Sequence, residues 1–181
     1  MKAHFAALAR YNAWANCGLY DAAAKLADAD YRADRGAFFK SMHGTLNHLL
    51  TADRVWMHRF TGDGPSPTRL DTIWHERLAE LRVAREAEDR RIVAYVDSLT
   101  GEQLKGTIRY RRVSTPEEFV QALAPALTHF FNHQTHHRGQ ARSILCSFGH
   151  RDLVLDLLAY QRQADAGQAR NEAGPTAKSP V

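Results

Sequence analysis

Four of the ten histidines in this 181-residue chain lie within nine residues, at positions 129, 133, 136 and 137. His133 and His137 are four residues apart, so on a helix their imidazoles lie one above the other on the same face. Two imidazoles at this spacing can bind one metal ion from a single helix, as in helical zinc sites. The pair falls in line with the apolar residues Phe119, Leu123 and Ile144, so it points inward, where an unpaired imidazole costs free energy. A metal ion would remove that cost, whereas the alternative is a pair of core histidines bonded to carbonyl or carboxylate oxygens.

A third ligand from another helix would decide between these alternatives. His48 lies at the margin of the apolar stripe in the segment 37–60, where a side chain can reach a neighbouring helix. The residue pattern alone therefore favours His48, with His43 and Asp53 as the next candidates.

Apolar residues recur at three- and four-residue spacing in four segments, about 3–26, 37–60, 72–99 and 116–148. This pattern predicts an all-α fold, a four-helix bundle with a long crossover connection. The segment 107–113 has β character and predicts an extended segment or a small hairpin within that connection. Arg85 and Glu88 interrupt the stripe of the third helix, so its middle is either exposed or pairs buried charges.

The boundaries of the last long helix follow from local signals. Thr115-Pro116-Glu117-Glu118 reads as a capping box with proline at the first helical position, which predicts a helix from residue 116. Pro125 should bend this helix, and Gly149 should end it. A short helix is expected at about 153–161. The predicted domain therefore spans residues 1–162, and residues 163–181 are predicted to be a disordered tail.

Composition limits the class of protein. The chain is 44% hydrophobic and 24% charged with a net charge of +4, which is typical of a single globular domain. No apolar run is long enough to span a bilayer, no signal peptide is evident, and the two cysteines form no CxxC pair, so a reduced, cytoplasmic protein is expected. Arg109-Tyr110-Arg111-Arg112 is interpreted as a solvated edge. We therefore expect no nucleic-acid or membrane partner.

Three motifs resemble those of a known family. They are the segment 41–56 (SMHGTLNHLLTADRVW), the segment 133–140 (HQTHHRGQ) and the segment 11–16 (YNAWAN). Together they are similar to the signatures of the DinB (DinB/YfiT-like) family, which is unrelated to the DNA polymerase of that name. The resemblance extends from about residue 8 to residue 145.

The resemblance implies a four-helix bundle that holds one divalent metal ion per chain through three histidines. The metal positions of the family match His48, His133 and His137. Three imidazoles suit Zn, Ni, Fe or Cu alike, and zinc or nickel is the expected ion. Three neutral ligands leave an open position, which is typical of a catalytic rather than a structural site.

By resemblance, the expected function is that of a metal-dependent thiol S-transferase or a thiol-dependent isomerase, which acts on a small molecule together with a low-molecular-weight thiol. One alternative is a metal-dependent hydrolase, with Asp53 as an imperfect general base. Another is a non-catalytic metal-binding protein of the stress response. Asn12 either lines the metal cavity, with Tyr11 or Trp14 on its wall, or fixes helix register as a buried asparagine.

A homodimer is also expected. A second apolar edge on the last long helix leaves surplus apolar surface, and such surfaces commonly pair about a twofold axis. This edge consists of Leu127, Phe131, Leu145 and Phe148.

Overall fold

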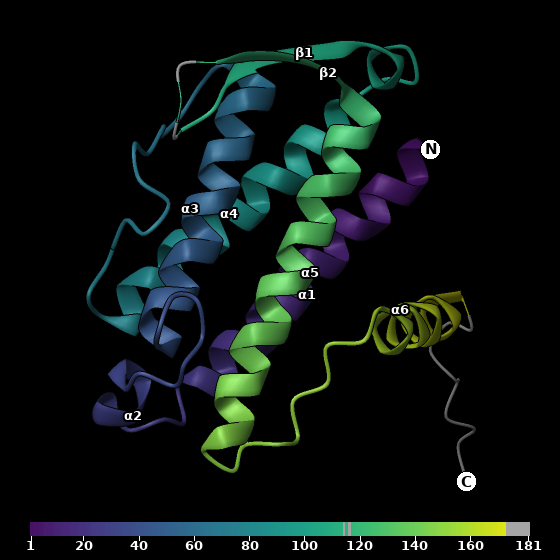
Figure 1. Ribbon diagram of the computed structural model, residues 1–181. Helices are drawn as coiled ribbons and strands as arrows, with labels where there is room; N and C mark the ends of the chain where they lie inside the picture. Colours follow the sequence, from purple (N-terminus) through teal and green to yellow (C-terminus); the bar gives the residue numbers. More distant parts are fainter. Residues whose placement is uncertain (114, 116, 173–181) are drawn as a thin grey trace, which may run out of the picture.

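The computed structural model describes residues 1–113, 115 and 117–172, and it is mostly helical with one small antiparallel sheet (Figure 1). The four long helices are α1 (Lys2–Ala23), α3 (Met42–Thr61), α4 (Leu78–Ser98) and α5 (Leu123–Ser147). The shorter elements are α2 (Asp28–Arg32), the 3-10 turn η1 (Gln103–Lys105), β1 (Thr107–Arg111), β2 (Glu118–Ala122) and α6 (Leu157–Glu172). Of the helices in the described part of the chain, none is both long and apolar enough to cross a membrane.

Each long helix packs against two others. Helix α1 contacts α4 and α5, and α3 contacts the same two helices from the other side. The hairpin of β1 and β2 crosses one end of this arrangement, above α3 and α5 (Figure 1). The helix that carries His48 and the helix that carries the histidine cluster are therefore neighbours.

Helix α3 has clear signals at both ends. Ser41 precedes it with an extended backbone, and its hydroxyl accepts a hydrogen bond of 3.1 Å from the amide of Gly44, which satisfies one of the free amides of the first turn. Gly62 follows the helix with a φ of +72°, a left-handed conformation that glycine adopts at little cost.

The hairpin corrects two predictions, the all-α class and the start of the last long helix. Thr107 pairs with Ala122 and Arg111 pairs with Glu118, so the extended segment predicted at 107–113 has a partner strand. That partner occupies residues 118–122, where a helix was predicted, and α5 begins only at Leu123. The local capping signal was therefore outweighed by pairing with β1. Ser114 and Pro116 lie outside the described residues.

The predicted bend at Pro125 was also wrong, because this proline lies in the first turn of α5. Backbone amides at that position have no partner within the helix, so the missing N–H of proline costs nothing there. The predicted end of the helix was correct within two residues: α5 stops at Ser147, and Gly149 follows with a φ of +86°.

Helix α6 is longer than the short helix predicted at about 153–161. It spans Leu157–Glu172, so residues 163–172, which the sequence pattern assigned to a disordered tail, are helical. Residues 173–181 lie outside the described part of the chain.

The interior consists of two apolar clusters separated by a polar layer. One cluster lies toward the hairpin and includes Phe5, Trp56, Ile92 and Phe130. The other lies toward the opposite end and includes Leu19, Leu46, Leu81 and Ile144. Along each long helix, the residues between the two clusters are buried and polar: Asn12 and Asn16 on α1, Asp53 on α3, Arg85 and Asp89 on α4, and Gln134 and Arg138 on α5.

Arg85 is paired with two carboxylates of this polar layer, whereas Arg138 is bonded to neutral side chains. Arg85 contacts Asp53 at 2.6 Å and Asp89 at 3.0 Å. Burial alone would lower the pKa of Arg85, but the two carboxylates raise it above its ordinary value. Arg138 donates to the side-chain oxygen of Asn12. Of the two alternatives for the interrupted apolar stripe of the third long helix, the structure therefore shows the pairing of buried charges and not an exposed helix middle.

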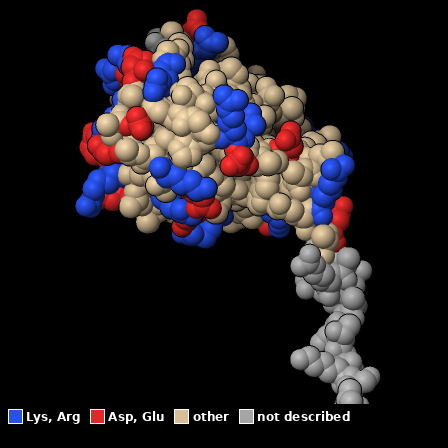
Figure 2. Space-filling model, turned by 90° about the horizontal axis from the view of Figure 1, so that it is seen from below, with Lys and Arg blue, Asp and Glu red and all other residues tan. Residues whose placement is uncertain are grey.

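Charges on the outer surface are mixed. The view from below, toward the end away from the hairpin, shows Lys and Arg interspersed with Asp and Glu (Figure 2). No extended area of one sign is visible on this face.

Candidate metal centre

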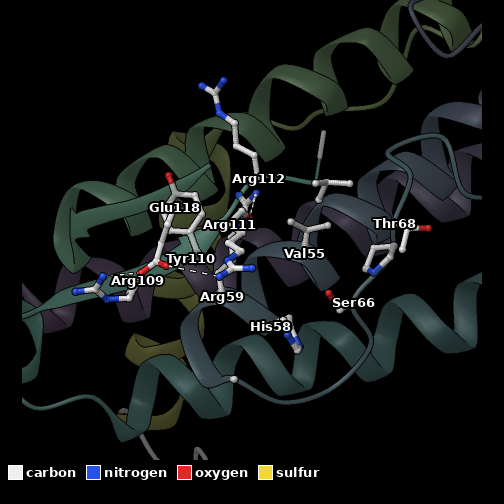
Figure 3. A pocket seen from close by; sticks show the side chains of 13 residues that line it. Val55, His58, Arg59, Ser66, Thr68, Arg109, Tyr110, Arg111, Arg112 and Glu118 are labelled. Atoms are coloured by element: carbon white, nitrogen blue, oxygen red, sulfur yellow. Dashed lines mark hydrogen bonds and ion pairs between the residues drawn. The ribbon is translucent and has the colours of Figure 1, made fainter. Parts of the chain in front are cut away.

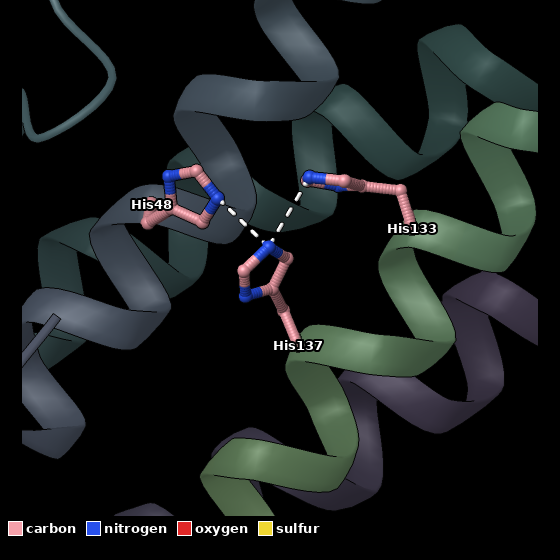
Figure 4. A group of neighbouring side chains, drawn as sticks. All are labelled: His48, His133 and His137. Atoms are coloured by element: carbon pink, nitrogen blue, oxygen red, sulfur yellow. Dashed lines mark hydrogen bonds between the residues drawn. The ribbon is translucent and has the colours of Figure 1, made fainter. Parts of the chain in front are cut away.

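His48 from α3 and His133 and His137 from α5 point toward one another across the gap between the two helices (Figure 4). The Nε2 atom of His137 lies 3.2 Å from Nε2 of His48 and 3.2 Å from Nε2 of His133. Ligand nitrogens at about 2.0–2.1 Å from a tetrahedral zinc ion are roughly 3.3 Å apart, so this spacing suits a shared ion. Within the described part of the chain, these three histidines form a group of possible ligands whose nitrogens lie close enough together to hold one metal ion.

In two of the rings, a hydrogen bond made by Nδ1 determines which nitrogen carries the proton. Nδ1 of His48 lies 2.8 Å from the carbonyl oxygen of Leu70, which can only accept, so Nδ1 donates and Nε2 carries a lone pair. Nδ1 of His137 donates in the same way to the side-chain oxygen of Gln140 at 2.8 Å. The Nε2 atoms of these two rings therefore face each other at 3.2 Å without a hydrogen between them. That contact is repulsive unless a cation lies between the lone pairs.

Burial keeps the three imidazoles neutral. It lowers the pKa of His48 to about 4, against a smaller rise from the bond to Leu70. Burial and the neighbouring histidines lower the pKa of His133 to about 3. Burial also lowers the pKa of His137. Neutral imidazole is the form that ligates metals, so at pH 7 all three rings are ready to bind an ion.

Phe39 covers one side of the site. Its ring stacks on His48 with the centroids 3.7 Å apart and an interplanar angle of 16°. The loop can approach α3 this closely because residue 44 is glycine: a Cβ there would lie 2.2 Å from the carbonyl oxygen of Phe39. Gly44 therefore lets an aromatic wall stand against the candidate ligand His48.

The connection between α3 and α4 supplies the partner of His48. Asn47 attaches the backbone of this connection to α3, because its side-chain oxygen accepts a hydrogen bond of 2.8 Å from the amide of Trp74. Thr51 adds a second attachment, since its hydroxyl accepts from the indole of Trp74 at 2.8 Å. These contacts hold the loop that places the Leu70 carbonyl beside His48.

A cavity of about 220 Å³ opens beside the histidines. His48 and His133 form part of its wall, with Trp56, Arg59 and His129. A larger cavity of about 570 Å³ lies next to it, between α3, the following loop and the hairpin (Figure 3). The two cavities share lining residues, Val55, Arg59, Arg112 and Val113, so a small molecule can contact both.

Other candidates from the sequence lie elsewhere. His43 contacts the carbonyl oxygen of His75 at 3.2 Å, and Asp53 is fully buried against Arg85. Asn12 is 1% exposed and bonded to Asp89 and Arg138 in the polar layer. Among the described residues that line the cavity beside the histidines, none of these three appears. The position of Asn12 agrees with the register-fixing alternative.

The aromatic residues expected on the cavity wall pack against the C-terminal part of the chain. The hydroxyl of Tyr11 donates to the carbonyl oxygen of Leu155 at 2.6 Å, and the indole of Trp14 donates to Gln163 at 3.0 Å. The residues that sequence reasoning missed are Phe39, Leu70 and Arg59. Two of them act through a loop contact, for which helical spacing carries no signal.

Comparison with known proteins agrees with these features. The DinB family model matches residues 1–173 of the chain. A relative, Protein DinB of Bacillus subtilis (strain 168), is 25% identical over 165 residues, which cover 84% of this chain and 91% of the relative.

Proposed function

Because this chain belongs to the DinB family, we propose that His48, His133 and His137 hold one divalent metal ion and that the protein is a metal-dependent thiol S-transferase or thiol-dependent isomerase. The observation that carries the proposal is the convergence of the Nε2 atoms of three neutral imidazoles beside a cavity. Zinc or nickel is the proposed ion. We interpret the four long helices as a four-helix bundle, with the hairpin in the long connection between α4 and α5.

The donor set fits an ion with an open position. Three histidines supply three ligand atoms, and within the described residues no carboxylate or thiolate joins the group, so a fourth position is left for a substrate. A divalent ion there would lower the pKa of a bound thiol and make it a thiolate nucleophile at pH 7.

The residues around the site would position the substrate. Phe39 covers one face of His48, which leaves the cavity side as the approach for a small molecule. Trp56 lines that cavity and offers an apolar surface for an electrophile.

The two cysteines are free thiols, which supports the proposal that the protein works in the reducing cytoplasm.

A hydrolase is less well supported than a transferase. A hydrolytic site needs a general base within hydrogen-bond reach of the attacking water. Asp53, the candidate base, is fully buried and paired with Arg85. The described residues that line the cavity beside the histidines include no carboxylate.

The test compares zinc-loaded, nickel-loaded and chelated protein in the conjugation of cellular thiols to a small electrophile. We expect conjugation only with metal, one ion per chain, and loss of both metal and activity in His137→Ala but not in His4→Ala, which changes an exposed histidine on α1. Equal rates with and without metal would leave a non-catalytic metal-binding protein. Chelator-sensitive hydrolysis of an ester or amide without any thiol would instead support the hydrolase.

A further inference from the structure

The larger cavity beside the candidate metal centre is strongly basic. Arginines 59, 109, 111 and 112 line it, and Glu118 is the one carboxylate among its described lining residues (Figure 3). We propose that this cavity binds an anionic group, a carboxylate or a phosphate, of the small molecule that reacts at the histidines, with Arg59 and Arg112 as the anion-binding residues. This inference rests on the proposed function and specifies its substrate class.

Arg59 is held in place without a counter-ion. Its guanidinium lies 4.5 Å from the ring centroid of Trp56 and 4.4 Å from that of Tyr110, so two aromatic rings fix its plane. Its hydrogen bond is a long one, 3.5 Å to the carbonyl oxygen of Arg111. Within the described residues, Arg59 has no carboxylate within 4.0 Å. Burial lowers the pKa of Arg59, which shows that its charge is partly desolvated.

Three other buried or half-buried arginines, Arg54, Arg85 and Arg91, each contact a carboxylate. Arg138 is buried without one, but it donates to the side chains of Asn12 and Thr135. Arg54 and Arg91 both contact Glu88, at 3.8 and 2.9 Å, and Arg85 contacts Asp53 at 2.6 Å. A half-buried guanidinium that is rigidly placed and lacks such a partner retains donors for a ligand. A guanidinium can bind a carboxylate or a phosphate through two parallel hydrogen bonds.

Arg112 adds a second charge at the same place. It lies over the ring of Phe119, with 5.0 Å between guanidinium carbon and centroid, and in the described part of the chain it forms no ion pair. Arg109 and Arg111 are partly neutralised, because both contact Glu118, at 2.5 and 3.9 Å. The uncompensated charge of the cavity is therefore concentrated at Arg59 and Arg112.

These two arginines stand where the two cavities join. Both line the smaller cavity together with His48 and His133, and both line the larger one. One molecule can thus place its sulfur at the histidines and its acidic group at the arginines. The run 109–112 was predicted to be a solvated edge, and its three arginines are indeed exposed. Arg112 also lines both cavities, which the sequence pattern did not indicate.

The test titrates zinc-loaded protein by calorimetry with three matched ligands. Mercaptohexanoate and mercaptohexanol carry a thiol at one end of the same carbon chain and differ only in the acidic group, and hydroxyhexanoate lacks the thiol. The variants are Arg59→Gln and Arg112→Gln. The matched control is Arg90→Gln, which removes an exposed arginine of α4 that lines neither cavity.

We expect mercaptohexanoate to bind about tenfold or more tightly than mercaptohexanol, as for a hydrogen-bonded charge pair. This preference should fall severalfold in both test variants and persist in Arg90→Gln. Arg112 is exposed on the hairpin, so its variant keeps the test decisive if Arg59→Gln unfolds. Competition by acetate and by inorganic phosphate at constant ionic strength then tells a carboxylate site from a phosphate site.

Failure of the inference and failure of the proposed function give different results. Three results would overturn the anion site. In the first, mercaptohexanoate binds no more tightly than mercaptohexanol. In the second, its advantage over mercaptohexanol is the same in the wild type and in Arg112→Gln. In the third, neither mercaptohexanoate nor hydroxyhexanoate binds. If hydroxyhexanoate binds as tightly as mercaptohexanoate, the anion site stands and the thiol reaction loses its support. If the two thiols bind equally and the arginine variants change nothing, the thiol reaction stands without the anion site.

Discussion

The nitrogen of His137 that faces the other two histidines is kept free by Gln140, one turn further along α5. Partners of this kind orient a ligand and raise its basicity, and their loss typically weakens metal affinity by about 10- to 100-fold. We expect Gln140→Ala to weaken zinc binding by this factor in a competition assay with a chromogenic chelator. Asn132→Ala, an exposed change on the same helix, should have no effect. Equal affinities in the two variants would show that Gln140 does not support the site.

The low pKa of His48 makes the metal-free protein sensitive to acid. In the unfolded chain this imidazole binds a proton below its ordinary pKa of 6.5, whereas in the folded chain it does so only near 4. The free energy of unfolding should therefore fall as the pH falls from about 6.5 to about 4, by at most about 3 kcal/mol from this residue. Urea unfolding of metal-free wild type and His48→Gln across this range checks it. Parallel curves for the two proteins would contradict the assignment.

The candidate ligands were predictable from the sequence because two of them obey helical spacing and the third lies on the stripe of another helix. The residue pattern alone favoured His48 over His43 and Asp53, and the family resemblance indicated the same residue. Contacts such as Phe39 on His48 were not predictable, because they depend on where a loop meets α3. Asn12 shows the same limit: a polar residue on an apolar stripe indicates burial but does not say beside which group.

At the scale of a single element, two glycines offer a matched test. A Cβ at Gly44, in the first turn of α3, would collide with the carbonyl oxygen of Phe39, whereas one at Gly139 on α5 would meet nothing within 4 Å. We expect Gly44→Ala to destabilise the protein by about 2 kcal/mol or more and to weaken metal binding through the displaced Phe39. Gly139→Ala should stabilise it by about 0.5–1 kcal/mol, because alanine is the better helix former.

Thermal unfolding and metal titration of both variants measure these effects. The same change in melting temperature for the two substitutions would contradict the packing role of Gly44.

The hairpin shows why the strand at residues 118–122 was not predicted from the sequence. Residues 118–122 alternate between exposed and half-buried, a pattern with a period of two, but Phe119 also fits the helical stripe that continues through Leu123. The preceding capping signal favoured the helix. Pairing with β1 decides the outcome, with Tyr110 opposite Phe119, and a contact between separate segments is not encoded in local propensity.

At the scale of the whole molecule, the polar layer ties the four long helices together. Arg85 is 1% exposed and contacts carboxylates on its own helix and on α3. Removing one partner of a buried ion pair leaves an uncompensated charge, which costs about 3–5 kcal/mol. We therefore expect Arg85→Met to lower stability by about this amount in urea unfolding. Arg90→Met, on the exposed face of α4, should change it by less than about 0.5 kcal/mol. A small effect at residue 85 would mean that the layer is well hydrated.

The proposed ion would join α3 to α5, so it should stabilise the entire fold by mass action. A 100-fold excess over the dissociation constant contributes about 2.7 kcal/mol, which corresponds to roughly 5–10 °C in melting temperature. Chelation should remove this increment while the helical circular dichroism remains, because both apolar clusters persist without metal. Complete loss of helical signal on chelation would mark the site as structural.

The homodimer stays a prediction, but the surface on which it was based is no longer available. Of the four residues of the predicted apolar edge, Leu127, Phe131 and Leu145 are at most 5% exposed within the single chain, and Phe148 is half-buried. Any dimer would need another face, and sedimentation velocity measures the oligomeric state directly.

The distribution of the histidines over two helices has a consequence for the order of folding. His133 and His137 lie on one helix, so α5 alone already offers two nitrogens to an ion before any tertiary contact forms. An ion bridging these positions would link two successive turns of the helix, and it would offset part of the entropic cost of nucleating α5. His48 can join only after α3 has docked. Metal present during synthesis would thus favour early formation of α5, and α3 would then assemble onto a helix that is already loaded.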